Sequence, residues 1–98
     1  MLYRIHPSER AELDIERALA YLSQFYPGTP ISFRSLLREI LSNLKHNPYM
    51  YPVYEPNTKY RRAVVGSYIL FYKINEERKY VNIFRVLRGS WDITEVSL

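Results

Sequence analysis

The fold is decided by the stretch Lys-Tyr-Arg-Arg-Ala-Val-Val-Gly-Ser-Tyr-Ile-Leu-Phe-Tyr-Lys-Ile at residues 59–74, together with Asn-Ile-Phe-Arg-Val-Leu-Arg-Gly-Ser-Trp-Asp at residues 82–92. Both parts are rich in β-branched and aromatic residues, which is typical of β-strands. The pattern predicts strands at about 59–66, 67–75 and 80–88. Because the connections between them are short, we expect the three strands to form an antiparallel meander.

Two helices are expected before this meander. Ser8 is a favourable N-cap, and an apolar residue recurs every three or four positions after it, which predicts a helix at about 9–25. Thr29 and Pro30 suit an N-cap and a first helical position, and a second apolar stripe predicts a helix at about 30–46. Because few residues separate the two stripes, the helices should form an antiparallel hairpin.

The remaining segments complete the architecture. Residues 2–6 alternate like a short strand, whereas the prolines and tyrosines of residues 48–58 favour an irregular but packed segment. Asp92 and Glu95 have capping-box spacing, which allows one marginal turn. The order β-α-α-β-β-β predicts an α+β fold in which a helical hairpin packs on one face of a small antiparallel sheet, as one domain over residues 1–98.

The composition excludes several classes of function. The chain has no cysteine, and its two histidines are far apart, so neither a disulfide framework nor a metal site with ligand spacing is expected. No cofactor is expected either, because no phosphate-binding loop or nucleophile elbow is present. No apolar run approaches the roughly 20 residues of a membrane span. We therefore expect a cytoplasmic protein that does not associate with membranes.

Positive charge is concentrated in the predicted sheet. The net charge of the chain is +4, and residues 50–98 contribute eight basic and five acidic residues to it. Arginine is costly inside a sheet unless it is paired or solvated, so the arginines there should face water or a partner. They suit a phosphate or an acidic peptide, although they also fit ordinary surface charge on a sheet. The residues in question are Arg61, Arg62, Arg85 and Arg88, and Trp91 beside them is a candidate aromatic anchor.

The carboxylates do not suggest a catalytic pair. Asp14 and Glu16 are expected on the solvated side of the first helix. Glu76 and Glu77 are adjacent in a predicted turn and should therefore point apart. The residues alone assign no catalytic group.

The motifs and their order resemble the RelE/ParE family of bacterial toxins. The resemblance rests on Ile5-His6-Pro7, Tyr60-Arg61, Gly66-Ser67-Tyr68, Tyr72 and the closing Arg85-Val86-Leu87-Arg88-Gly89. It implies the toxin component of a type II toxin–antitoxin (plasmid stabilisation) system, which causes growth arrest. It also implies a heteromeric complex with a cognate antitoxin, whose acidic segment is disordered when free and folds on binding.

Two branches of the family differ in target. RelE-like toxins cut mRNA on the ribosome with basic residues and often a C-terminal tyrosine or histidine, whereas ParE-like toxins poison DNA gyrase. Arg61 occupies one basic position of the RelE pattern, but Ala63 and Ile69 stand where two others are expected. The arginine expected past the last strand falls at Arg88 or at Gly89.

The missing groups favour the ParE-like branch. No tyrosine or histidine follows Tyr80, so the usual C-terminal acid or base is absent. We predict that Arg61, Arg62, Arg85, Arg88 and Trp91 contact a macromolecular target such as DNA gyrase without catalysing a reaction. The alternative is a ribosome-dependent mRNA endoribonuclease that uses Arg61 and Arg88. A second alternative is a small basic binding module, for RNA or an acidic peptide, without toxicity.

Overall fold

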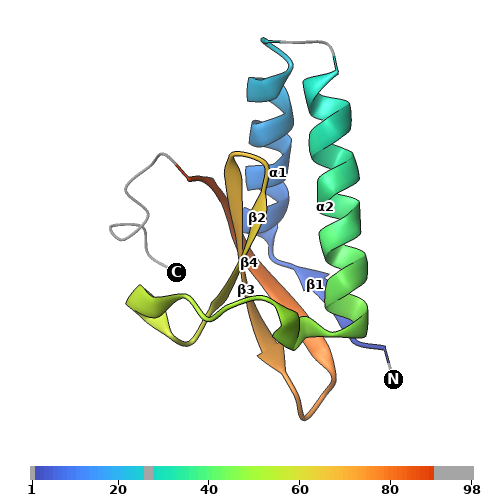
Figure 1. Ribbon diagram of the computed structural model, residues 1–98, viewed down its shortest axis with the longest axis vertical. Coiled ribbons are helices and arrows are strands. Elements are labelled where there is room, and N and C mark those ends of the chain that lie inside the picture. The colour runs from blue at the N-terminus through green and yellow to red at the C-terminus, as the bar shows by residue number, and fades with distance from the viewer. Residues whose placement is uncertain (1, 26–27, 90–98) are drawn as a thin grey trace.

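The structure is a computed structural model that describes residues 2–25 and 28–89, and it places two helices on one face of a four-stranded mixed sheet (Figure 1). The strand order is β1-β4-β3-β2. The predicted α+β architecture is therefore confirmed. The elements are β1 (Arg4–Pro7), α1 (Glu9–Leu22), α2 (Thr29–His46), β2 (Arg61–Val65), β3 (Tyr68–Asn75) and β4 (Tyr80–Arg88), with two short 3-10 turns at Pro48–Met50 and Glu55–Asn57.

The meander has the predicted topology. β2 pairs antiparallel with β3, and β3 pairs antiparallel with β4. Gly66 has a φ of 62° in the first turn, which a residue without a Cβ adopts at little cost. The prediction of an antiparallel sheet is wrong for β1: this strand, whose partner the sequence did not indicate, runs parallel to β4 and makes the sheet mixed.

The main core lies between the helices and the sheet. Successive side chains of a strand point to opposite faces, so every second residue of β2 and β3 faces the helices. The fully buried residues of this core include Ala11, Ala18, Leu44, Ala63, Val65, Leu70, Tyr72, Val81 and Ile83. A smaller cluster around Phe71 and Leu87 lies on the other face, where Tyr54 and Ile69 pack against it.

The helix ends differ from the sequence prediction by a few residues. α1 ends at Leu22, because Ser23 caps it and the hairpin extends past the end of the sheet (Figure 1). Phe25 is the last residue of the predicted helix and continues its apolar stripe in the sequence, but this residue is 55% exposed. Gly28 is the N-cap of α2, so Thr29 is the first helical residue. The proline then occupies the second position, where a missing N–H is also harmless.

The segment before β2 is packed, as predicted. The buried hydroxyl of Tyr72 donates to the carbonyl of Pro48 at 2.6 Å, and the side-chain amide of Asn43 donates to the hydroxyl of Tyr51 at 2.9 Å. Val53 forms an isolated bridge with Arg61, where β2 begins two residues later than expected. The ring of Tyr49 is an exception, since this residue is 48% exposed.

Two further predictions concern membrane crossing and the turn near the C-terminus. Within residues 2–25 and 28–89, no helix combines the length and hydrophobicity that a membrane crossing requires. The predicted turn at Asp92 and Glu95 lies outside the described residues.

Candidate functional site

One edge of β4 loses its strand partner where β1 ends. β1 pairs with β4 only as far as Ile83, and the register between β3 and β4 shifts by one residue at the same point. This shift makes Phe84 the extra residue of a β-bulge. The start of α1 covers the edge: the Ser8 backbone N–H donates to the Ile83 carbonyl at 2.9 Å, and the Ser8 hydroxyl donates to the Phe84 carbonyl at 3.0 Å. The predicted N-cap role of Ser8 is also confirmed.

Asp14 satisfies the next polar groups along this edge. Its Oδ2 accepts hydrogen bonds from the Val86 backbone N–H at 3.0 Å and from Arg85 Nε at 2.7 Å, while its Oδ1 accepts one from Arg85 Nη2 at 3.1 Å. The prediction that Asp14 is solvated was wrong, because only 7% of this residue is exposed. Arg85 was expected to face water or a partner, but its nearest partner is internal and its side chain is 11% exposed. Arg85 directly follows the bulge, on the edge of β4 that β1 leaves uncovered, where the backbone already requires an acceptor.

A cationic pocket of about 230 Å³ lies between α1 and β4, and we call it the arginine pocket. The guanidinium carbon of Arg88 lies 4.3 Å from the centroid of the Tyr21 ring, which is a cation–π contact. Burial raises the pKa of Tyr68, so this phenol stays protonated at neutral pH. Because Asp14 neutralises Arg85, the net positive charge of the lining comes from Arg17 and Arg88. The lining residues are Asp14, Arg17, Ala18, Tyr21, Tyr68, Arg85, Val86 and Arg88.

A second cationic pocket, which we call the Arg61 pocket, lies where β3 runs past the start of β2. Its volume is about 210 Å³, and Lys59, Arg61 and Lys73 line it without an acidic residue. The guanidinium of Arg61 donates through Nη1 to the Tyr51 carbonyl at 2.7 Å, and its central carbon lies 5.2 Å from the centroid of the Tyr49 ring. Arg61 therefore anchors the segment before β2 as well as lining the pocket.

Glu76 connects three parts of the chain near this end of the sheet. Its Oε2 accepts hydrogen bonds from the hydroxyls of Tyr3 and Tyr49, both at 2.7 Å, and its Oε1 pairs with Lys79. The hydrogen bond from Lys79, followed by those from Tyr3 and Tyr49, lowers the pKa of Glu76 to about 2. The turn between β3 and β4 is thereby joined to the residue that precedes β1 and to the segment before β2.

The predicted arginines do not form one site. Arg61 lies opposite Tyr72 in the β2–β3 register, whereas Arg88 lies opposite Tyr68 in the β3–β4 register. Four residues along β3 and two strand spacings separate their Cα atoms by roughly 16 Å. Their side chains diverge further, because one contacts the segment before β2 and the other contacts α1.

The other predicted residues are placed elsewhere. Arg62 alternates with the core residue Ala63, so it lies on the sheet face away from the helices, opposite Phe71. Trp91 lies outside the described residues. Sequence reasoning did not select Arg17, Lys59 or Lys73 as site residues. Lys59 and Lys73 lie in residues 56–75, which contain four basic residues and no acidic residue, and this run of positive charge was the available signal.

This arrangement suits anion binding. Guanidinium groups form paired hydrogen bonds with phosphate or carboxylate, and each pocket offers at least one such group. Among the described residues, no histidine lines either pocket, and no group of three or more acidic or histidine side chains is arranged to hold a metal. Ala63 is 1% exposed, so the position that is basic in RelE-like toxins is a core position here.

Several solved toxins share this fold. The RelBE2 toxin–antitoxin complex of Mycobacterium tuberculosis includes a chain that is 20% identical, with a TM-score of 0.65, and the match covers 90% of this chain and 99% of that one. A chain of the chromosomal ParDE system of Pseudomonas aeruginosa is 12% identical, with a TM-score of 0.70, and the match covers 89% and 96%. Escherichia coli RelE, as an arginine-substituted mutant in the free state, is 16% identical, with a TM-score of 0.67 and coverage of 96% and 90%. No curated protein sequence matches the chain significantly.

The sequence also matches a family described as the ParE toxin of type II toxin–antitoxin system, parDE, over residues 5–93. This match spans all the described helices and strands except the first residue of β1. The chain belongs to the ParE toxin family of type II toxin–antitoxin systems. The resemblance inferred from the sequence motifs is confirmed at the level of the family and the fold.

Proposed function

We propose that this ParE-family toxin arrests growth by binding DNA gyrase, and that a cognate antitoxin neutralises it in a cytoplasmic heteromeric complex. Family membership supports the existence of a cognate antitoxin partner, and the related Mycobacterium tuberculosis and Pyrococcus horikoshii structures are complexes with an antitoxin. The absence of a tyrosine or histidine after Tyr80 supports a target that is bound and not cleaved.

The separation of Arg61 from Arg88 is the observation that carries this proposal. RNA cleavage by attack of a 2′-hydroxyl needs charge stabilisation and proton transfer at a single phosphate. The two arginines that would supply the charge lie in different pockets, roughly 16 Å apart by register. Contact with a large target needs no such convergence, because a protein interface spans many residues on each side.

The target is tested by inducible expression with paired measurements of the DNA damage response and of bulk translation. The proposal predicts an early DNA damage response, and inhibition of purified gyrase supercoiling by the purified toxin. Primer extension on translated mRNA should show no new cleavage sites. Codon-phased cleavage that disappears in Arg61→Ala would instead establish the ribosome-dependent endoribonuclease.

The contact residues are tested by alanine substitution. Removing one contact arginine should cost about 1–3 kcal/mol of target affinity, roughly one to two decades in Kd. Arg61→Ala, Arg88→Ala and Trp91→Ala should each weaken growth arrest, whereas Arg10→Ala on the exposed surface of α1 serves as the matched control. Circular dichroism must confirm folding of each variant, since Arg61 also anchors the segment before β2. Unchanged gyrase inhibition in all three contact variants would reject these contacts.

A further inference from the structure

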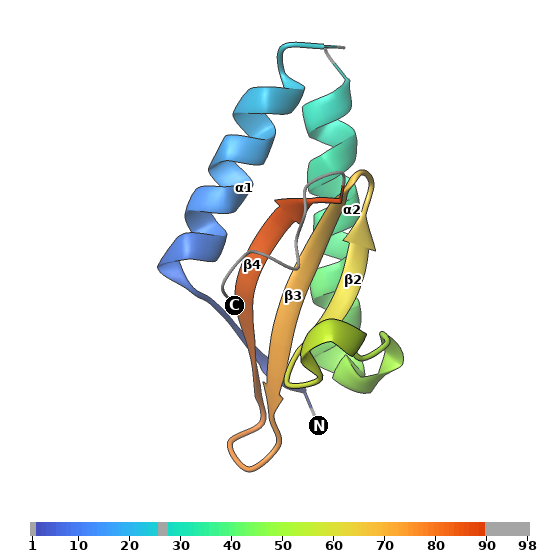
Figure 2. The same ribbon diagram turned by 90° about the vertical axis from the view of Figure 1, so that its left-hand side faces the viewer.

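The arginine pocket, which lies between α1 and β4, contains a buried hydrogen-bond donor that no other described residue uses. Figure 2 shows these two elements side by side. Tyr68 on β3 lies directly opposite Arg88, the last residue of β4, and only 4% of Tyr68 is exposed. Its hydroxyl forms no hydrogen bond with another described residue, although no fully enclosed side-chain oxygen or nitrogen among these residues lacks a partner. The hydroxyl is therefore open to a cavity and free to donate there.

Cationic donors surround this hydroxyl. Burial raises the pKa of the Tyr68 phenol and the positive charge of Arg88 opposes this rise, so the hydroxyl and this guanidinium lie near each other. Arg17 lines the same pocket from α1, is exposed, and takes no part in the ion pairs found among the described residues. Arg85 donates to Asp14 through Nε and Nη2, and no described residue accepts from its Nη1. The lining thus offers donors from α1, β3 and β4 around one space.

The charge of the lining favours a dianion. Three arginines and one aspartate line the pocket, which leaves two positive charges. A phosphate monoester carries about −1.5 to −2 charges at pH 7 and has three strong acceptor oxygens, whereas a carboxylate carries one negative charge. Guanidinium groups pair with phosphate through two parallel hydrogen bonds. The volume of about 230 Å³ is below the range of about 300–1,000 Å³ for pockets that hold drug-sized ligands, and it therefore suits a small anion.

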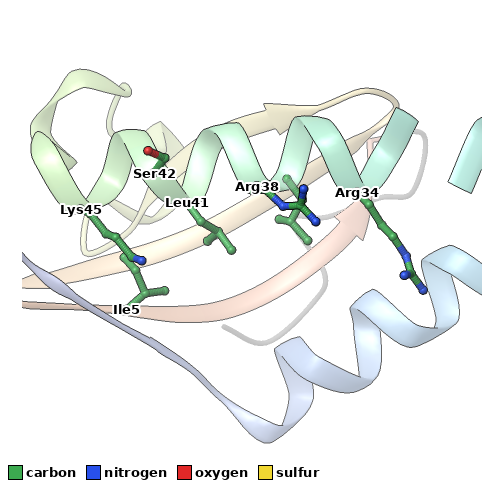
Figure 3. A pocket seen from close by; sticks show the side chains of 7 residues that line it. Ile5, Arg34, Arg38, Leu41, Ser42 and Lys45 are labelled. Carbon is green, nitrogen blue, oxygen red and sulfur yellow. The ribbon is translucent and has the colours of Figure 1, made fainter. Parts of the chain in front are cut away.

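The other cationic cavities lack this combination. A cavity of about 430 Å³ runs along α2 beside β1 (Figure 3), and its basic residues all lie on α2 and are exposed. These residues are Arg34, Arg38 and Lys45. In the Arg61 pocket, Arg61 and the buried Tyr72 already donate to backbone carbonyls. Among the described residues of these three cavities, only the arginine pocket has a buried side-chain donor that is unused.

We propose that the arginine pocket binds the dianion of phosphate or of a small phosphate monoester, held by Arg17, Arg88 and the Tyr68 hydroxyl. Arg85 contributes its Nη1, while Asp14 fixes the orientation of that guanidinium. Inorganic phosphate and a nucleoside 5′-monophosphate share the required chemistry, so both are used as probes. This site goes beyond the proposed function, because its occupation requires neither gyrase nor an antitoxin.

Isothermal titration calorimetry with the purified toxin measures the binding. The probes are inorganic phosphate, adenosine 5′-monophosphate and, as the compound without a phosphate group, adenosine. The parent should bind both phosphates, and adenosine should bind much more weakly. Equal affinity for the two phosphates would assign the contacts to the phosphate group alone, and tighter binding of the ester would add the sugar to them, so either result supports the proposal. No binding of either phosphate at millimolar concentration would overturn it.

Substitutions separate binding from a structural role. Arg88→Ala should raise the Kd for phosphate by roughly ten- to a hundredfold, because it removes a charged donor. Tyr68→Phe removes a hydroxyl that no other described residue binds, so it should leave the urea midpoint nearly unchanged and raise the Kd by roughly three- to tenfold. Arg10→Ala on the exposed surface of α1 is the matched control and should change the Kd by less than about twofold.

Two results with these variants would overturn the proposal. One is an equal effect of Arg88→Ala and Arg10→Ala, and the other is an unchanged Kd in Tyr68→Phe. If Arg88→Ala does not fold, Arg17→Ala at an exposed position of α1 provides the same comparison with the control.

The pH dependence tests the charge of the ligand. Phosphate monoesters lose one negative charge below a pKa of about 6, so the Kd of adenosine 5′-monophosphate should rise as the pH falls below about 6, relative to the Kd of sulfate, which stays a dianion. Titration of the lining groups affects both anions, so the difference between them reports the ligand alone. These groups are Asp14, Arg17, Tyr21, Tyr68, Arg85 and Arg88. A monophosphate Kd that follows the sulfate Kd at every pH would overturn the assignment to a dianion.

Nucleic acid is measured as the competing occupant. A labelled single-stranded RNA with a 5′-hydroxyl contains only phosphodiesters, which carry one negative charge each. If this RNA binds more tightly than phosphate and loses affinity in Arg88→Ala but not in Arg10→Ala, the pocket belongs to a nucleic-acid backbone and the proposal is overturned. The expected result is that the RNA binds the parent and Arg88→Ala with the same affinity.

Discussion

Replacing Asp14 with alanine should destabilise the protein strongly. The substitution leaves the Arg85 guanidinium, with 11% of its side chain exposed, without its counter-charge, and leaves the Val86 N–H on the strand edge without its acceptor. Removing one partner of a buried ion pair costs about 3–5 kcal/mol, whereas a surface pair contributes at most about 1 kcal/mol. A domain of this size has a total stability of about 5–15 kcal/mol, so the loss is a large fraction of it.

Urea unfolding followed by circular dichroism measures the effect. With an m-value of about 2 kcal/mol/M, a loss of 4 kcal/mol lowers the midpoint by about 2 M. Glu16→Ala on the exposed side of α1 is the matched control and should change the stability by less than about 0.5 kcal/mol. Asp14→Ala/Arg85→Met should be less destabilised than the sum of the single variants, by about 1–3 kcal/mol. A loss below about 1 kcal/mol in Asp14→Ala would refute the reasoning, because Asp14 would then behave as a surface residue.

Three further predictions concern the other contacts that hold the sheet in place. Ser8→Ala removes the cap of α1 and its bond to Phe84, so it should cost about 1 kcal/mol and lower the Tm by about 4–8 °C, as calorimetry can measure. Tyr72→Phe leaves the Pro48 carbonyl without its donor and should cost about 1–3 kcal/mol at pH 7 in urea unfolding. Burial raises the pKa of the Tyr72 hydroxyl, so the protonated hydroxyl stabilises the folded parent below pH 10, and this stabilisation is lost as the pH rises further. Tyr72→Phe has no hydroxyl and should lack this pH dependence. The pKa of Glu76 is lowered to about 2, so its contribution is complete above pH 4.5 and is lost as the pH falls toward 2. The difference in urea midpoint between the parent and Glu76→Gln should therefore disappear over that interval, and a difference that does not vary with pH would contradict the assigned contacts.

Local patterns were sufficient to predict most of the fold. Short turns and alternating residues define the meander, and the two apolar stripes define the helices, because these features depend on neighbours in the sequence. The position of β1 could not be predicted in the same way. A parallel strand at the N-terminus finds its partner through contacts more than 70 residues away, and nothing in its own sequence identifies β4. The sequence pattern predicted the end of α1 too late, because apolar residues continue in the sequence beyond the point where the sheet can bury them.

The sequence contained a signal for the buried pair that the charge pattern concealed. Asp14 lies three residues after Ala11 and four before Ala18, on the stripe that faces the core. An acidic residue at such a position indicates a buried partner, but the partner, Arg85, is 71 residues away and lies next to a β-bulge that the sequence did not predict. Counting charge over each half of the chain likewise concealed the contrast between the two helices, because the acidic residues of α1 offset the basic residues of α2.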